Sequence, residues 1–357
     1  MRSIRHRNPV MCYWAVLTLV CGLYAGNLER PVSAQENPKA ARLDPAQVLV
    51  SKQRVIFDSS FLSGSSKSEW SNGFIVSREI ETFAPGSTNV RLYDRTGQKI
   101  REAVVWFPGA RRVLLKSAVA DPEGNIVVSG STEKADGTTA PFIARTDLTG
   151  KVSKVIQTTR IDPSQVCLAP NGTTWAFGGT GYEDTGLPKP GNTLRQFDFD
   201  KGEIGAYIPR STFPRLPMPN ELAQIACLPT SVVIYSGRAH EYIELEYATG
   251  LARRYKVEGP SGLWLAGFAA LGPRKVFGEL ANPSNQNDAR TGLYSLAIDE
   301  NAMTARWVPI IGAVGDQSQV GTITSLWGAD GDSLVFSRVG DVSGKVAIHW
   351  ATPPTTN

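Results

Sequence analysis

Glycine turns recur along the chain at nearly constant spacing. Four follow short strand-like runs, at Gly97, Gly150, Gly202 and Gly250, and Asn301 occupies the fifth position of the series. The intervals between them are 53, 52, 48 and 51 residues. Gly and Asn both tolerate the left-handed backbone of a tight hairpin. A repeat of about 50 residues indicates that one supersecondary unit is copied along the chain.

A second series of six hairpin turns alternates with the first, near Gly73, Gly124, Gly172, Thr230, Pro273 and Gly331. Short β-branched or aromatic runs separate the turns, without 3.6-residue periodicity, which predicts an all-β chain. If the second series joins the first two strands of each unit and the first series joins the last two, the final unit lacks its fourth strand. Val48–Phe57 is strand-like and has no local partner. We expect it to pair with Lys345–Trp350 and so remove two exposed edges.

This pattern of repeated four-stranded units resembles the broad class of secreted bacterial six-bladed β-propellers. The resemblance covers nearly all of the chain after the N-terminal segment, and it implies a fold rather than an activity. The expected architecture is an all-β, six-bladed β-propeller of four-stranded antiparallel blades, closed by an N-terminal strand. The expected blades span residues 70–107, 112–158, 164–208, 222–257, 263–310, and 320–350 together with 47–57.

The N-terminus has the composition of a secretory signal. Arg2, Arg5 and Arg7 precede an apolar run from Val10 to Ala25, and Val32-Ser33-Ala34 follows as a small-residue cleavage site. The sequence therefore predicts a signal peptide over 1–34, a flexible leader over 35–46, one propeller domain over 47–357, and a secreted or periplasmic location. A retained anchor is the alternative, although the apolar run is shorter than the roughly 20 residues of a membrane-spanning helix.

Cleavage would change both charge and cysteine content. It removes four Arg and one Glu, so 37 basic and 33 acidic residues become 33 and 32, a net charge of +1. That balance argues against a nucleic-acid partner, and no second apolar stretch predicts a membrane span. Cys167 and Cys227 remain, in matching contexts on the expected inner strands of consecutive blades. The favoured interpretation is two buried thiols, because such positions usually lie farther apart than the 7 Å or so that a bridge allows; a disulfide is the alternative, since export permits oxidation.

Connection length differs between the two ends of the expected blades. The hairpin turns at one end are tight, whereas the other end carries three long insertions, Gly179–Asn192, Pro209–Glu221 and Ala281–Arg290. Long loops on a rigid scaffold commonly bind ligands, although each could also be a solvated spacer. The candidate ligand-binding residues are Tyr182, Glu183, Asp184, Arg210, Arg215, Glu279, Asn285, Asp288 and Arg290.

Catalytic motifs are absent from the sequence. It has no nucleophile elbow, zinc-protease helix or Cys-x-x-Cys pair, so no catalytic residue, metal or cofactor is predicted. The stretch Asn282–Asp288 is rich in oxygen donors but lacks the pattern of a calcium loop. His240 opens a strand whose carboxylates we expect on the wet face of an outer strand. Trp175, Trp264 and Trp327 are interpreted as blade-packing residues rather than as a sugar-stacking platform.

Three functions remain open at this stage. A binding propeller for a polar small molecule, glycan or protein is favoured, because it needs no catalytic set and agrees with the loop asymmetry. A carbohydrate-active or lactone-hydrolysing enzyme would need carboxylates that converge at the channel mouth, and the available ones are Glu183, Asp184, Glu279 and Asp288. A structural envelope component would need neither feature.

Overall fold

The computed structural model describes residues 49–58, 66–180, 189–212, 223–237, 239–285, 287–315, 323–338 and 345–353. Residues 43–357 form one compact unit. The predicted signal peptide and leader lie outside the described residues, and so do Tyr182, Glu183, Asp184 and Arg215.

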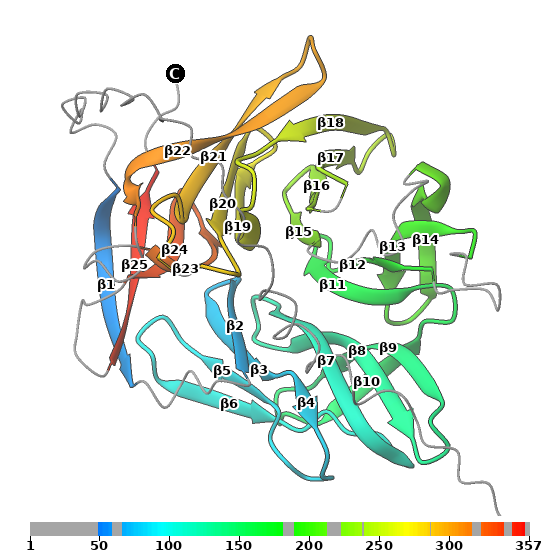
Figure 1. The fold of residues 1–357 in the computed structure, drawn as a ribbon. Helices are drawn as coiled ribbons and strands as arrows, with labels where there is room; N and C mark the ends of the chain where they lie inside the picture. Colours follow the sequence, from blue (N-terminus) through cyan, green and yellow to red (C-terminus); the bar gives the residue numbers. More distant parts are fainter. Residues whose placement is uncertain are drawn as a thin grey trace, which may run out of the picture. The chain divides into compact units, whose positions relative to one another are not determined.

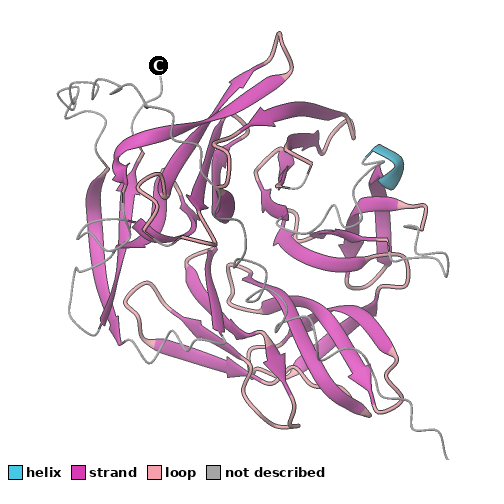
Figure 2. Cartoon of the chain, viewed as in Figure 1, coloured by secondary structure: helices cyan, strands magenta, loops and turns pink. Residues whose placement is uncertain are grey.

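The described part of this unit is built almost entirely from strands (Figure 1, Figure 2). The innermost strands are β2 (Ser66–Ser71), β7 (Ala110–Ala120), β11 (Asp162–Leu168), β15 (Ala223–Cys227), β19 (Trp264–Gly272) and β23 (Ile323–Asp330). The second strands are β3 (Phe74–Glu79), β8 (Ile126–Lys134), β12 (Thr174–Gly179), β16 (Ser231–Ser236), β20 (Lys275–Ala281) and β24 (Ser333–Arg338). The third strands are β5 (Val90–Tyr93), β9 (Thr139–Thr146), β13 (Asn192–Asp198), β17 (Glu241–Glu246), β21 (Gly292–Asp299) and β25 (Lys345–Thr352). The outer strands are β6 (Lys99–Ala103), β10 (Val152–Gln157), β14 (Gly202–Pro209), β18 (Ala252–Glu258), β22 (Thr304–Val314) and β1 (Val50–Asp58).

Hydrogen bonding joins these strands into five sheets. Within each group of four the pairing is antiparallel, inner strand to outer strand. The outer strands β18 and β22 pair in parallel over Lys256–Glu258 and Thr304–Arg306, so two groups merge into one eight-stranded sheet. The two-residue strand β4 (Glu81–Thr82) adds a fifth strand beside β7. The short 3-10 helix η4 (Arg210–Thr212) follows β14.

The expected pairing of the two chain ends is confirmed. Strand β1 lies antiparallel to β25, with Val50 opposite Thr352 and Asp58 opposite Lys345. It supplies the outer strand of a sheet whose other three strands come from the C-terminal end of the chain. Phe57 of β1 is buried against the turn glycine Gly97, where an added Cβ would lie 2.6 Å from the phenyl ring.

Burial decreases from the inner half of each group of strands to its outer edge. Every residue of β16 is buried, whereas most residues of the outer strand β10 are exposed. This gradient arises because both faces of an inner or second strand are covered by neighbouring groups. Hydrophobic clusters fill the spaces between neighbours: Phe57, Trp70 and Ile348 pack between β1–β25 and β2–β3, and other clusters lie between the remaining adjacent groups.

The inner strands lie side by side around a centre, which is the arrangement of a β-propeller (Figure 1). Polar side chains link consecutive inner strands. The hydroxyl of Ser71 on β2 donates to the carbonyl of Ala120 on β7 (3.0 Å). The amide of Val166 on β11 donates to the hydroxyl of Ser117 on β7 (3.3 Å).

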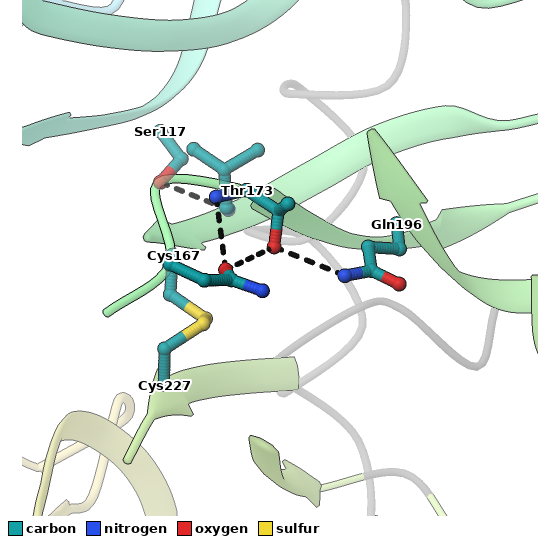
Figure 3. The surroundings of a disulfide bond; sticks show 7 residues. Ser117, Cys167, Thr173, Gln196 and Cys227 are labelled. Carbon is teal, nitrogen blue, oxygen red and sulfur yellow. Dashed lines mark hydrogen bonds between the residues drawn. A yellow bond between two sulfur atoms is a disulfide. The ribbon is translucent and has the colours of Figure 1, made fainter. Parts of the chain in front are cut away.

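The interpretation of the two cysteines as free thiols is wrong. Cys167 on β11 and Cys227 on β15 form a disulfide, with Cα atoms 5.5 Å apart (Figure 3). Both lie at the turn end of their strands, where β11 and β15 are in contact. Spacing along the sequence identified equivalent positions, but it could not reveal that neighbouring inner strands converge to bridging distance at this end.

Candidate functional site

A pocket opens between the group β15–β18 and the group β19–β22, at the end of the sheets that carries the long connections. We call it the Trp264 pocket. Its volume is about 550 Å³, within the roughly 300–1,000 Å³ range of small-molecule sites. Its lining consists of Tyr235, Gly237, His240, Gly259, Pro260, Ser261, Gly262, Leu263, Trp264, Leu265, Leu280 and Trp307.

The floor of the pocket depends on a glycine in β20. Trp307 on β22 is 6% exposed and meets Tyr235 edge to face, with ring centroids 5.3 Å apart. A Cβ added at Gly278 would lie 2.8 Å from the six-membered ring of Trp307 and 2.5 Å from Leu265. Only glycine at position 278 leaves room for the indole of Trp307. The packing of Trp307 at the floor of the pocket therefore depends on this glycine.

The wall formed by residues 259–263 is held by two residues from the next long loop. Arg290 donates to the carbonyl oxygen of Ser261 (3.1 Å) and makes a two-point contact with Asp288, at 2.9 and 2.7 Å. Asn282 donates to the same carboxylate (2.9 Å). These donors hold the pKa of Asp288 well below its usual range, because they stabilise the ionised form. The wall is therefore ordered by a satisfied ion pair rather than by packing alone.

The opposite wall is a turn around His240. This residue has a positive φ of 51°, and its carbonyl oxygen accepts a hydrogen bond from the amide of Val257 on β18 (2.7 Å). His is among the residues that adopt this left-handed conformation more often than most. The imidazole thus belongs to a turn before β17, not to the strand in which the sequence pattern placed it.

Trp264 lies at the rim of the pocket, and its exposure contradicts the expectation that it packs inside a blade. Trp175 and Trp327 are buried, as expected, at 2% and 4% exposure, but Trp264 is 52% exposed. Trp264 begins β19, immediately after the loop, so the indole reaches beyond the covered part of the sheet. The strand-like pattern around it concealed this position, and no local sequence signal distinguished it from the buried tryptophans.

The described lining of the pocket is aromatic and polar. Tyr235 and His240 are the titratable side chains among the described lining residues, and Arg238, between Gly237 and His240 in the sequence, lies outside the described residues. Burial raises the pKa of Tyr235, so its phenol stays neutral at physiological pH. The arrangement can therefore offer aromatic faces, peptide groups, a hydroxyl and an imidazole to a ligand.

The opposite end of the sheets is closed by short turns. They are two to five residues long, whereas the connection between Pro209 and Ala223 spans 13 residues. Side chains tie these turns together across groups: Arg95 pairs with Asp330 and lies over the ring of Trp70 (5.8 Å), and Arg274 pairs with Glu244 (2.6 Å). Turns so short cannot build a concave wall.

A second cavity, of about 420 Å³, lies among the inner strands. Its polar lining includes Lys67 and Glu69 of β2, with 3.7 Å between the ammonium and a carboxylate oxygen, together with Gln165 and Gln224. Beside it, Glu279 is 3% exposed and accepts a hydrogen bond from the amide of Leu326 on β23 (2.8 Å). Burial raises the pKa of Glu279 to about 7.

The candidate residues from the sequence divide into separate environments. Asp288 and Arg290 border the Trp264 pocket, and Asn285 lies in the same loop, where its side chain accepts from the amide of Asn287 (3.1 Å). Arg210 is buried, at 6% exposure, and its amide donates to the carbonyl of Gly191 (2.7 Å). Glu279 belongs to the contact between β20 and β23. Within the described residues, Glu279 and Asp288 thus have different partners and do not form a shared hydrogen-bonded pair.

The carboxylates after His240 are not a wet outer face. Strand β17 is the third strand of its group, and Glu244 is 7% exposed and paired with Arg274 from the β19–β20 turn. Glu241 pairs with Arg254 of β18. The partners that bury these groups come from elsewhere in the chain.

The described residues include no group of three or more His, Cys, Asp or Glu side chains placed to hold a metal ion. No helix in the same residues has the length and apolar character needed to cross a membrane. His349 on β25 is 5% exposed and lies 3.0 Å, Nδ1 to Oγ, from Ser51.

Comparison with known proteins gives distant structural likenesses. No family model and no curated protein matches the sequence. A Bacteroides fragilis protein described as exported is 10% identical, with a TM-score of 0.49, over 88% of this chain and 98% of that one. A luciferin-regenerating enzyme is 9% identical, with a TM-score of 0.44, over 84% of this chain and 95% of the other. The WD40 repeats of RRP9 are 9% identical, with a TM-score of 0.41, over 85% of this chain and 100% of theirs. At such low identity and superposition these likenesses carry no argument about function.

Proposed function

We propose that this chain is an exported binding propeller that recognises a polar ligand, a glycan or a peptide, on the face built by its long connections. The observation that carries the proposal is the Trp264 pocket, a hollow of about 550 Å³ at that end of the sheets. Its walls are already fixed by the Arg290–Ser261 hydrogen bond and by the anchored turn at His240. A preformed pocket loses little conformational entropy on binding, which favours affinity.

The proposal includes six blades. Its support is the distribution of the core among the described residues: a separate hydrophobic cluster lies between each pair of adjacent four-strand groups, and the last cluster joins the group of β23–β25 and β1 to β2 and β3. On this interpretation, the eight-stranded sheet consists of two blades whose outer strands, β18 and β22, pair at their edges.

Export is supported by two independent features. The N-terminal order of basic residues, apolar run and Val32-Ser33-Ala34 matches a secretory signal. The Cys167–Cys227 disulfide agrees with an oxidising compartment, because stable disulfides are rare in reducing cytosol.

Shortening the long loops tests the proposed binding face. We would replace Gly179–Asn192, Pro209–Glu221 and Ala281–Arg290 with tight turns and measure binding to arrays of glycans and of peptides. The expected result is loss of the wild-type ligand with the fold retained by circular dichroism. Leu148→Ser is the matched control on the short-turn face, where Leu148 is 57% exposed, and it should bind as wild type does. A ligand that binds the loop-shortened variant with unchanged affinity would show that the three long loops do not form the binding face, and the proposal would be wrong in that respect.

A further inference from the structure

We propose that the Trp264 pocket binds a neutral saccharide, with a sugar ring stacked on the indole of Trp264. The inference rests on the proposed binding face and names both the site and the chemical class of its ligand. It also assigns a role to Trp264, which the sequence pattern placed inside a sheet.

The exposure of Trp264 is the first argument. Other tryptophans of the described chain, such as Trp70, Trp307 and Trp350, are between 3% and 6% exposed, whereas Trp264 is 52% exposed at the mouth of a cavity. A large apolar ring left in water loses the favourable burial of its area, roughly 25 cal/mol per Å². A ligand with an apolar face recovers that area. The C–H face of a pyranose ring has this character, while its hydroxyl edge remains polar.

The chemistry of the described lining is the second argument. Those lining residues that the structure describes include no carboxylate, ammonium or guanidinium group. The nearest ion pair in the bordering loop, Asp288 with Arg290, is mutually satisfied, and Arg290 also donates to the carbonyl of Ser261. Among the described lining residues, an acidic glycan or a free peptide terminus would lose hydration without gaining a charged partner, which is unfavourable. The described lining therefore favours uncharged ligands.

The hydrogen-bonding groups of the lining match the hydroxyl-rich edge of a sugar. Gly259, Pro260, Ser261 and Gly262 form a loop of peptide groups with one hydroxyl, and His240 faces the pocket from the other side. Sugar hydroxyls both donate and accept, so they can use carbonyl oxygens, amides and an imidazole alike. An aromatic peptide side chain would use the rings but leave most of these polar groups without a partner, which carries a cost.

The floor sets the orientation of the ring. Trp307 and Tyr235, which are 6% and 5% exposed, meet edge to face at 5.3 Å and line the same pocket as Trp264. A side chain at position 278 would overlap Trp307, so the position of this indole depends on Gly278. A rigid floor and one exposed ring give a site for stacking on one face, with hydroxyls directed at the loop.

The test uses the full mature protein and a panel of neutral oligosaccharides: β-glucans, α-glucans, xylans and N-acetylated hexosamine oligomers. Sialylated and sulfated glycans and tyrosine-containing peptides complete the panel. Binding is measured by calorimetry for wild type, Trp264→Ala and Trp264→Phe. We expect a neutral oligosaccharide to bind wild type, at least tenfold weaker binding by Trp264→Ala, and intermediate binding by Trp264→Phe. Phe83→Ala is the matched control, because Phe83 is another exposed aromatic residue, at 65%, on a connection at the same end of the sheets.

The outcomes separate this inference from the function on which it rests. If a ligand of the panel binds wild type and Trp264→Ala equally but not the loop-shortened variant, the binding face stands and the saccharide site at Trp264 is wrong. Preference for a charged glycan or a peptide likewise overturns the inference alone. If a ligand binds all of these variants equally, both proposals fail. Melting temperatures of the two Trp264 variants within about 2 °C of wild type establish that a loss of binding is not a loss of fold.

Discussion

Glu279 is a buried carboxyl group at the contact between two adjacent groups of strands. It is 3% exposed, and its oxygen accepts from the amide of Leu326 on the neighbouring inner strand (2.8 Å). An added Cβ at Gly267 would lie 3.0 Å from the same oxygen. The residue therefore joins β20 to β23 in a space that only glycine at position 267 leaves open. Its pKa of about 7 follows from removal of the carboxylate from water, which the charge of Lys67 offsets only in part.

The pKa of Glu279 predicts how stability depends on pH. Below the ordinary pKa of 4.5, the carboxyl is protonated in both the folded and the unfolded chain, and its contribution to stability is fully present. Between pH 4.5 and about 7 the unfolded chain loses the proton first, so the free energy of unfolding falls as pH rises. Above pH 7 the loss is complete, at roughly 3 kcal/mol. Glu279→Gln keeps an acceptor for Leu326 without the charge, and should raise the melting temperature at pH 8 relative to wild type.

Calorimetry at pH 4.5 and pH 8 checks this prediction. The difference between Glu279→Gln and wild type should be small at pH 4.5 and should reach its maximum by pH 8. Glu123→Gln is the control, because Glu123 is an exposed residue of a turn and its neutralisation should have little effect at either pH. An equal destabilisation of Glu279→Gln at both values would mean that its carboxyl is not held protonated by burial.

Single residues also show the limits of sequence reasoning about the site. Loop length directed attention to the loop that holds Asp288 and Arg290, because long connections are visible in the sequence. Trp264 could not be recognised, since exposure depends on where β19 leaves the cover of its neighbours. The same holds for Glu279, whose partner Leu326 is 47 residues away in the chain.

The strands themselves were more predictable than their partners. Turn glycines such as Gly97 and Gly150 have positive φ, 88° and 82°, so a local backbone requirement leaves a mark on the sequence. That mark gave the hairpins and the order of strands. The contacts between groups leave no comparable mark, because they depend on which side chains face each other across two separately formed sheets. The burial of Glu244 by Arg274 is one example.

The Cys167–Cys227 disulfide joins two adjacent inner strands, β11 and β15. The cysteines are 60 residues apart in sequence, and a cross-link over a loop of that size restricts the unfolded chain by up to roughly 4 kcal/mol in the chain-entropy model. Replacing both cysteines by alanine should lower the free energy of unfolding by about 2–4 kcal/mol. Urea denaturation of oxidised wild type and the double variant measures the difference. Added reductant should lower the free energy of unfolding of wild type but not that of the double variant. A double variant as stable as oxidised wild type would argue against the disulfide.

At the scale of the whole unit, adjacent groups of strands are joined both by apolar clusters and by polar or covalent links. Ser71 binds Ala120 between β2 and β7, Ser117 binds Val166 between β7 and β11, the disulfide follows between β11 and β15, and Glu279 reaches β23. The chain ends complete this arrangement through β1 and β25. A repeated array gains stability largely from interfaces between neighbours, so the pairing of the two ends should contribute beyond its own hydrogen bonds.

Removal of β1 should therefore destabilise the whole unit. A chain that begins at residue 59 lacks β1, while a control that begins at residue 47 lacks only the predicted signal and leader. Without β1, the edge of β25 is unpaired, and the space against Gly97 that Phe57 fills becomes empty. Loss of a buried Phe alone costs about 3–5 kcal/mol. For a unit of this size that is a fall in melting temperature of roughly 5–8 °C, to which the lost ladder adds. Phe57→Ala supplies the measurement if the shorter chain does not fold, and it should melt below the control that begins at residue 47. Equal melting temperatures for both chains and for Phe57→Ala would show that the pairing of β1 with β25 adds nothing to the stability of the fold, and closure by the N-terminal strand would then be wrong.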